Sequence, residues 1–358
     1  MTTVKISTAA KNIPFKYLTP GATGVWGDFQ FFVNEPTAKA DWWVVMENLS
    51  DIEETVCPKE NTIFVAMENF NMKKYEKAFV NQFNWVVTCP DTLTHPRQIH
   101  TQQMHFSHLF WSRRPEGQSL EDFHKQFKTY DELKAMKPSD IKKTKLLSVV
   151  ASSKTKTPGQ KLRNEFITAL KKHFGDAMDA FAEKPDVFGP DTKVEKLKWN
   201  SIAPYKYYLA LENSLVPHYF TSNMPDAHLA GAFPFYHGHE SILDYYPKDS
   251  FIPIDMRDVE GSIKIIEQAI ANNTYEQHLD AVWKARDLWL NSYSMFPMLA
   301  SIISSLPRAN QPTRVSLRPE EKRRFKEKTA DFLKKSPIIY KTVKMLTSII
   351  KKPHGTQR

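Results

Sequence analysis

Three short apolar runs early in the chain are typical of buried β-strands. They are WWVVM at 42–46, TIFVAM at 62–67 and NWVVT at 84–88, and all are rich in β-branched or aromatic residues. Between the last two runs, aromatic residues recur every four positions from Tyr75 to Phe83, which places them on one face of a helix. The pattern predicts a strand, a helix and a strand in succession.

A second alternation of strands and helices begins after residue 145. The expected strands are LLSVVAS (146–152), YYLALEN (207–213), FPFYH (233–237) and FIPI (251–254), and the expected helices span 159–175, 261–271 and 274–290. Two successive alternations of this kind predict an α/β protein with two doubly wound parallel sheets, each covered by helices. A ligand site is expected in the cleft between them.

The segment from about 115 to 145 is rich in Lys, Asp and Glu and is typical of surface helices or a linker. We therefore place a domain boundary at its end. The expected units are residues 1–145, residues 146–310 and a C-terminal tail, 311–358.

Composition fits this picture of folded domains. The chain has 358 residues, of which 41% are hydrophobic and 25% charged, as in ordinary soluble proteins. No apolar run approaches the roughly 18 residues of a membrane span, and the first residues carry no run of signal-peptide length. With only Cys57 and Cys89 available, unpaired thiols in a reducing compartment are expected. These features favour a cytoplasmic location.

Walker-type ATPases, dinucleotide dehydrogenases, serine hydrolases and zincins lose support because their motifs are missing from the sequence. It contains no GxxxxGK[ST], GxGxxG, GxSxG or HExxH pattern. Two histidine pairs, His105 with His108 and His237 with His239, offer a metal alternative. Zinc needs three or four convergent ligands, and neither pair comes with a nearby Cys or a second matched pair. No metal site is therefore expected.

The positive charge of the chain is concentrated at its end. From Arg314 onward there are 14 Lys and Arg against 4 Asp and Glu, while the net charge of the whole chain is +9. Apolar residues such as Ile339, Val343 and Leu346 alternate with lysines there, which predicts a basic amphipathic helix that binds an anionic membrane surface. The alternative is a helix that packs back on the first domain. A nucleic-acid partner is not expected, because the charge lies outside the folded domains.

The most informative segment spans residues 203–257. It reads YKYYLALEN, then YFTSN, then a predicted helix, then FPFYHG and finally SFI. A strand that ends in polar residues beside the start of a helix is a favourable place for an anion. In order and spacing, the segment resembles the bacterial fucosyltransferases of glycosyltransferase family ten, which have a strand ending in Glu-Asn, then YVTEK, a helix, a VPIYWG-like strand and SFI.

Two further segments extend the resemblance to about residues 24–305. The family has an arginine near the start of the helix that follows a Ser-rich turn, and here LLSVVASSKTKTPGQKLR supplies Arg163. Upstream, a family strand ends in Gly-Glu-Asn or Gly-Glu-Pro, and here TIFVAMEN supplies Glu68 and Asn69.

The resemblance implies a GT-B fold, with two Rossmann-like domains facing each other across a cleft. It implies an N-terminal acceptor domain, a C-terminal GDP-fucose domain and inverting transfer of fucose without a metal or other cofactor. The implied partners are a GDP-sugar donor and a surface-glycan or lipopolysaccharide-type acceptor, with the enzyme peripheral on the inner face of the membrane. Glu68 would be the catalytic base. The donor-binding residues would be Arg163, Asn213, Tyr219, Thr221, Ser222 and Asn223.

One departure from the family pattern opens an alternative function. Where the family has Thr-Glu-Lys, this chain has Thr221, Ser222 and Asn223. The lysine that would face the diphosphate is therefore missing, and Lys154, Lys156 and Lys206 are the candidates to replace it. The alternative is an inactive or altered-donor relative that binds a nucleotide sugar or glycan without transferring fucose. Without the resemblance, the residue types alone favour a solvated loop carboxylate for Glu68 and a surface cation for Arg163.

Overall fold

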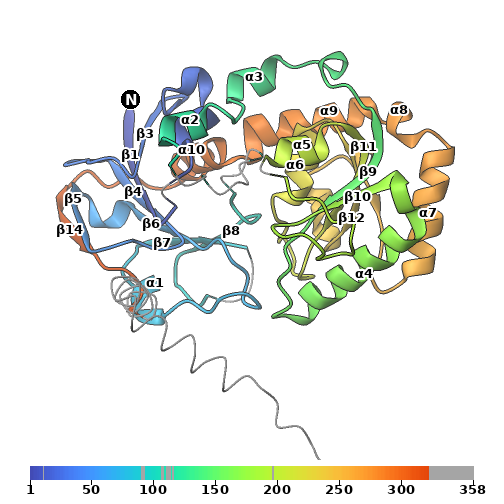
Figure 1. The fold of residues 1–358 in the computed structure, drawn as a ribbon. Coiled ribbons are helices and arrows are strands. Elements are labelled where there is room, and N and C mark those ends of the chain that lie inside the picture. The colour runs from blue at the N-terminus through green and yellow to red at the C-terminus, as the bar shows by residue number, and fades with distance from the viewer. Residues whose placement is uncertain are drawn as a thin grey trace, which may run out of the picture.

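Two parallel β-sheets, each packed between helices and loops, lie side by side in the computed structural model (Figure 1). The structure describes residues 1–10, 12–89, 93–105, 109, 114, 117–195 and 197–321. The first sheet belongs to the N-terminal half of the chain and the second to residues after Lys145. The expected α/β class with two sheets is therefore confirmed.

The first sheet has seven strands in the order β2-β3-β1-β4-β6-β7-β8, all parallel except β2. Their bounds are β1 (Thr2–Thr8), β2 (Val25–Trp26), β3 (Phe29–Val33), β4 (Trp42–Met46), β6 (Thr62–Val65), β7 (Trp85–Thr88) and β8 (Gln98–His100). The three strands expected from the apolar runs are β4, β6 and β7. The predicted helix between β6 and β7 shortens to α1 (Lys77–Val80), although Tyr75, Phe79 and Phe83 do pack on one ring, that of Phe64.

The second sheet has five parallel strands in the order β10-β9-β11-β12-β13. Their bounds are β9 (Lys145–Val150), β10 (Met178–Phe181), β11 (Tyr205–Leu211), β12 (Phe233–His237) and β13 (Ile252–Pro253). The main helices around it are α4 (Pro158–Phe174), α5 (Lys198–Ile202), α6 (Asn223–Leu229), α7 (Val259–Ala271), α8 (Thr274–Gln277) and α9 (Leu279–Leu288). All four strands expected in this half are present, and the sequence pattern missed only β10.

The strand order of the second sheet locates a ligand crevice. Numbered along the chain, its strands run 2-1-3-4-5, so the direction of winding reverses between β9 and β11. In doubly wound folds, ligands bind at such a switch point, outside the carboxyl ends of the strands. The residues that follow Val150 and Leu211 should therefore line a site.

The end of the described chain returns to the first sheet (Figure 1). Helix α10 (Met295–Ser305) packs with Val4, Ile6 and Trp42 in one core cluster, although the predicted boundaries group it with residues 146–310. Strand β14 (Thr313–Leu317) pairs antiparallel with β5 (Glu53–Cys57), so the segment predicted as a tail begins inside the folded body. Most of the predicted amphipathic tail, residues 322–358, lies outside the described residues.

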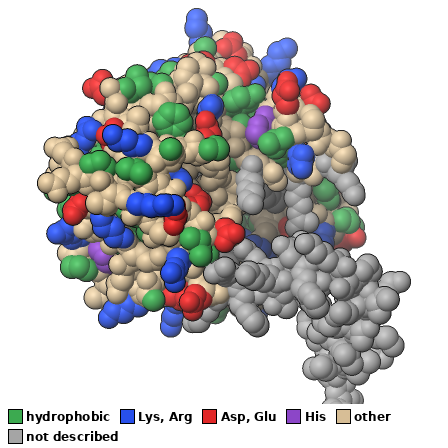
Figure 2. Space-filling view, turned by 90° about the vertical axis from the view of Figure 1, so that its left-hand side faces the viewer, with side chains coloured by type: hydrophobic (Ala, Val, Ile, Leu, Met, Phe, Trp, Pro, Cys, Tyr) green, Lys and Arg blue, Asp and Glu red, His purple; other side chains and the backbone are tan. Residues whose placement is uncertain are grey.

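The charged segment before β9 contains two short helices. Short helices α2 (Leu120–His124) and α3 (Tyr130–Ala135) occupy the charged segment before β9. Figure 2 shows basic and acidic side chains interspersed over one face of the molecule. Within the described ranges, no helix is long and apolar enough to cross a membrane. Cys57 and Cys89 are buried and unpaired, as expected.

Candidate active site

The switch point of the second sheet is closed on one side by the start of helix α4. Thr157 caps this helix and forms a capping box with Gln160. Gly159 lies so close to the loop after β11 that a Cβ atom there would meet the Asn213 carbonyl oxygen at 2.0 Å. A glycine is required for this approach, which brings the helix N-terminus directly beside Asn213.

Arg163 forms a buried wall of this crevice. Its side chain reaches back to the end of β9, where Nη2 lies 3.3 Å from Ser152 Oγ and 3.4 Å from the Ser152 carbonyl oxygen. Burial lowers the pKa of Arg163, and the nearby Glu212 carboxylate opposes this shift. Nε has no hydrogen-bond partner among the described residues. Arg163 is only 7% exposed, so it is not the surface cation of the alternative interpretation.

Glu212 organises the loop that carries four of the predicted donor residues. Its Oε1 accepts hydrogen bonds from the Thr221 backbone N–H at 2.8 Å and from Thr221 Oγ1 at 3.1 Å. Burial raises the pKa of Glu212 to about 7, even though Arg163 and Lys198 favour its charged form. The carboxylate therefore fixes Thr221 directly above the end of β11.

Lys198 reaches Ser222 and Asn223, the two positions at which the sequence departs from the family pattern. From helix α5, its Nζ donates to Ser222 Oγ at 3.2 Å and to Asn223 Oδ1 at 3.3 Å. It also pairs with Asp226 Oδ2 at 2.7 Å, and the Asp226 carboxylate raises the pKa of Lys198 despite its burial. The candidates for a replacement cation did not include this residue. Lys206, one of those candidates, lies at the amino end of β11 and pairs with Glu276.

Tyr219 connects this loop to the other half of the molecule. It packs with Val216 and with Cys89, which follows β7 of the first sheet. Burial raises the pKa of Tyr219 well above its ordinary value, and the carboxylates of Glu212 and Glu68 raise it further. Tyr219 thus lies between the two acidic groups of the cleft.

Glu68 follows the carboxyl end of β6 and is half-buried. Burial raises its pKa to about 7, and the Glu47 carboxylate adds to this increase. Lys154, on the loop after β9, and Lys73 lower the pKa in part. Since Lys154 follows a strand of the second sheet, Glu68 lies near that sheet, and its burial shows that it is not a freely solvated loop carboxylate.

Gln103 bridges the Glu68 and Tyr219 loops. Its backbone N–H donates to the His218 carbonyl oxygen at 3.0 Å, and its Nε2 donates to the Met67 carbonyl oxygen. Next to it, His105 Nε2 lies 2.5 Å from the Phe220 carbonyl oxygen. These contacts hold the two sides of the cleft together beside the predicted base.

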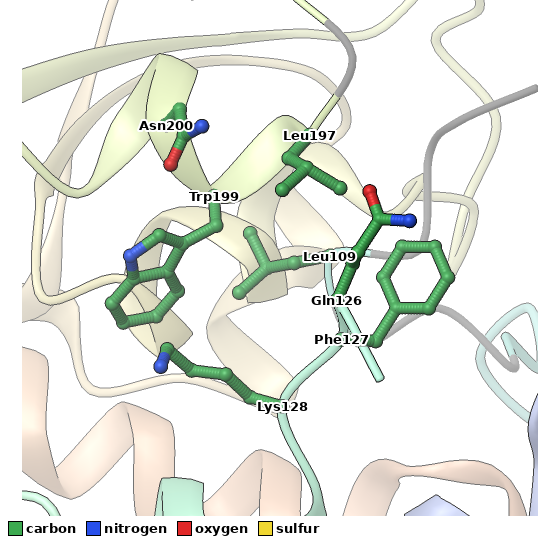
Figure 3. A pocket seen from close by; sticks show the side chains of 7 residues that line it. All are labelled: Leu109, Gln126, Phe127, Lys128, Leu197, Trp199 and Asn200. Carbon is green, nitrogen blue, oxygen red and sulfur yellow. The ribbon is translucent and has the colours of Figure 1, made fainter. Parts of the chain in front are cut away.

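A pocket of about 170 Å³ lies beside the start of helix α5. Figure 3 shows Trp199 and Lys128 on one side of this pocket, Gln126 and Phe127 on the other, and Leu109 between them. The Lys128 ammonium lies 4.6 Å from the centre of the Trp199 ring. No predicted site residue lines this pocket, so it is separate from the candidate active site.

The histidine pairs considered for a metal make other contacts. His237 Nδ1 lies 3.2 Å from the Ile254 carbonyl oxygen, and His239 Nδ1 lies 3.1 Å from Ser241 Oγ. Across the described part of the chain, no three His, Cys, Asp or Glu side chains are grouped to hold a metal ion. His108 lies outside the described residues.

The structure brings the seven predicted site residues into one region, with six around the end of β11 and Glu68 near Tyr219 and Lys154. Sequence reasoning missed Glu47, Gln103 and Lys198. Glu47 did carry a signal, because it follows the buried run WWVVM as Glu68 follows TIFVAM. Gln103 and Lys198 carried none, since each reaches the site through the tertiary fold.

One region of the chain matches a known protein family. Residues 141–289 match the family described as glycosyltransferase family 10 (fucosyltransferase), C-terminal part. The sequence has no significant match among curated proteins. A solved alpha1,3-fucosyltransferase is similar in structure over 87% of this chain and 91% of its own, with 14% identity and a TM-score of 0.46. Its complex with GDP gives 15% identity and a TM-score of 0.46, covering 86% of this chain and 91% of that one.

A solved alpha-glucosyltransferase in complex with UDP is similar over 85% of this chain and 100% of its own, with 8% identity and a TM-score of 0.50. Together with the two parallel sheets, this likeness identifies the GT-B fold. The match at residues 141–289 covers the sheet that carries Arg163 and the Glu212 loop. Over residues 141–289, less than half of its length, the chain is therefore similar to the family 10 fucosyltransferases, and its fold is that of a glycosyltransferase.

Proposed function

We propose that the protein transfers fucose from GDP-fucose to a hydroxyl group of a glycan acceptor, with inversion at the anomeric carbon. The acceptor oxygen attacks C1 of fucose on the face opposite the diphosphate. The bond from C1 to the phosphate oxygen breaks, and its electron pair leaves with GDP. Glu68 takes the proton of the acceptor hydroxyl.

The observation that carries this proposal is the setting of Glu68. A general base works best when its pKa lies near the working pH, and burial beside Glu47 raises the pKa of Glu68 to about 7. The residue also faces Lys154 and Tyr219 from the donor side of the cleft. A carboxylate in this position can receive a proton close to the departing nucleotide.

The donor side offers groups suited to a leaving diphosphate without a metal. Arg163 presents a planar fork of donors at the switch point, and the N-terminus of α4 lies beside it. Ser222 Oγ accepts a hydrogen bond from Lys198, so its own proton is free to be donated to a phosphate oxygen. In this proposal, Asn213, Tyr219, Thr221 and Asn223 shape the pocket for the nucleotide sugar.

The experiment is a fucosyl-transfer assay with GDP-fucose and N-acetyllactosamine-type acceptors, paired with GDP binding by calorimetry. We expect Glu68→Gln to abolish transfer and leave GDP affinity nearly unchanged, because a base contacts the acceptor and not the nucleotide. Glu260→Gln, at an exposed position on α7, is the matched control. Equal loss of transfer and binding in Glu68→Gln would assign the residue a structural role.

A second candidate function rests on Ser222 and Asn223. Their contacts with Lys198 fill the position where the family pattern has Glu-Lys, which suits a relative that binds a nucleotide sugar without fucosyl transfer or that uses another donor. The wild-type protein distinguishes the two functions. GDP binding without transfer from GDP-fucose supports the second candidate.

The acceptor and the location of the protein complete the proposal. The excess of Lys and Arg after Arg314 favours binding to an anionic membrane, where a surface glycan or lipopolysaccharide-type acceptor would be assembled. We propose a peripheral position on the cytoplasmic face. Deletion of residues 322–358 should then release the protein from anionic vesicles, whereas vesicle binding that survives the deletion excludes this role of the tail.

A further inference from the structure

A buried chain of polar contacts begins at Glu320, just after β14. The Glu320 side chain is 5% exposed, although it follows a strand at the edge of the molecule. Its Oε1 accepts the Glu76 backbone N–H at 2.8 Å, and its Oε2 pairs with Lys73 Nζ at 3.1 Å. The Glu320 backbone N–H also donates to Asn48 Oδ1 at 3.0 Å. The segment is thus bound at three points next to Glu47.

Lys73 continues the chain of contacts toward the cleft. Its ammonium pairs with Glu47 Oε1 at 2.8 Å and lies 4.2 Å from the centre of the Tyr75 ring. Glu47 has a φ of 66°, a left-handed backbone conformation that residues other than glycine rarely adopt. Such a conformation persists where surrounding contacts hold it, and here Lys73 and Tyr75 supply them.

Tyr75 completes the connection to the predicted base. Its hydroxyl group donates to Glu47 Oε2 at 2.5 Å. The Tyr75 hydroxyl oxygen in turn accepts hydrogen bonds from the backbone N–H groups of Met67 at 3.2 Å and Glu68 at 3.1 Å. Each link from Glu320 to the Glu68 backbone is therefore a direct hydrogen bond or ion pair.

We infer that Glu320 is a positioning residue for Glu68, acting through Lys73, Glu47 and Tyr75, so that the segment leading into the basic tail helps to hold the catalytic loop. This inference rests on the proposed function of Glu68 as the base. Glu320 lies outside the matched family region, residues 141–289, and its backbone immediately precedes the undescribed tail. The contacts therefore join the tail segment to the acceptor side of the cleft.

The charges around Glu68 predict in which direction its pKa changes when Glu320 is replaced. Glu47, Lys73 and Lys154 act on Glu68 directly, while Tyr219 and Cys89 lie near it from the loops on either side. Glu320 balances the charge of Lys73. When this balance is removed, Lys73 stabilises the ionised form of Glu68 more strongly, so the base should remain ionised to lower pH.

The experiment compares Glu320→Gln and Glu320→Ala with Glu321→Ala, an exposed neighbour whose backbone N–H donates to Glu76 Oε2 at 3.2 Å. Hydrogen exchange is measured for the peptide covering residues 66–76, and the pH dependence of kcat/KM is measured for fucosyl transfer. We expect at least threefold faster exchange in Glu320→Ala. In Glu320→Gln, which keeps the shape of the side chain, the acidic limb of the kcat/KM profile should move to lower pH.

The two measurements separate this inference from the proposed function. If hydrogen exchange is faster in Glu320→Ala but the wild-type protein transfers no fucose, the result supports the chain of contacts from Glu320 to Glu68 and contradicts the proposed function. Active enzyme in which neither the exchange nor the acidic limb differs from Glu321→Ala overturns the inference. A fall in kcat without any shift of the limb overturns it as well, because a merely structural role predicts that result.

Discussion

Lys198 Nζ lies 2.7 Å from Asp226 Oδ2, and both side chains are almost completely buried, with exposures of 5% and 0%. The pair joins helix α5 to helix α6 below the end of β11. Because Lys198 also donates to Ser222 and Asn223, its charge lies within the predicted donor loop without being part of it. A cation is therefore present where the sequence suggested that one had been lost.

The first prediction concerns the stability of this pair. Lys198→Met should lower the free energy of unfolding by about 3–5 kcal/mol, because it leaves the Asp226 carboxylate buried without its cation. Lys198→Met combined with Asp226→Asn should recover part of the loss, since the uncompensated charge is then removed. Urea unfolding measures both, with Lys264→Met at an exposed position of α7 as the control. A single variant as stable as Lys264→Met contradicts the prediction.

The second prediction concerns Arg163 as a diphosphate ligand. Arg163→Ala should weaken GDP binding by about 1.5–3 kcal/mol, the usual range for a charge-assisted hydrogen bond. Arg163→Lys should restore little of it, because an ammonium group lacks the planar fork of donors. Lys161→Ala, an exposed position on the same helix, is the control. Calorimetry that finds the same dissociation constant for wild type and Arg163→Ala would remove Arg163 from the binding site.

The third prediction uses the raised pKa of Glu212. Its pKa is about 7 in the folded protein and 4.5 is the ordinary value of a glutamate, so between these values the folded state binds a proton that the unfolded state has released. The contribution of Glu212 to stability therefore decreases as pH rises through this window. Glu212→Gln removes this dependence, so the stability of the variant relative to wild type should increase from pH 4.5 to 7, by at most about 1.4 kcal/mol per pH unit.

Urea unfolding of both proteins across this range provides the measurement. The buried histidines His105 and His228, whose pKa values fall to about 4, also make stability depend on pH. Their contributions are common to both proteins and cancel in the difference, which is why the difference is the relevant quantity. Parallel stability curves for wild type and Glu212→Gln would show that Glu212 ionises normally.

Much of the fold could be predicted from the sequence because its central strands are buried on both faces. WWVVM is an uninterrupted apolar run and FPFYH is an aromatic-rich one that ends in His237, and both form strands at those residues. Strand β1 mixes Lys5 and Ser7 with apolar residues and was missed. Those two side chains are buried by a contact with Glu53, which is distant in the sequence and cannot be inferred from a local pattern.

The candidate active site likewise contains residues that local sequence pattern predicts and residues that only tertiary packing places. Residues at strand ends, such as Glu68 and Asn213, could be placed because the carboxyl ends of parallel strands meet at one edge. Lys198 lies 24 positions before Ser222 and on another helix, and a lysine in a polar stretch is normally a surface residue. Its burial depends on Asp226, which only the packing of α5 on α6 brings into contact.

The final prediction tests whether the donor loop needs a cation at one place or only somewhere near Asp226. Asn223→Lys alone should weaken GDP binding, because Asn223 Oδ1 lies 3.3 Å from Lys198 Nζ and a second ammonium there would face the first. Lys198→Met alone should also weaken GDP binding.

In the double variant, the new lysine at position 223 is three residues before Asp226 on α6, a spacing at which the two side chains can pair. The double variant should therefore bind GDP at least tenfold more tightly than either single variant, a favourable coupling of about 1.4 kcal/mol or more. If calorimetry instead finds the double variant no better than the weaker single variant, the loop requires Lys198 in its own position, and Ser222 and Asn223 belong to a site reshaped around another donor.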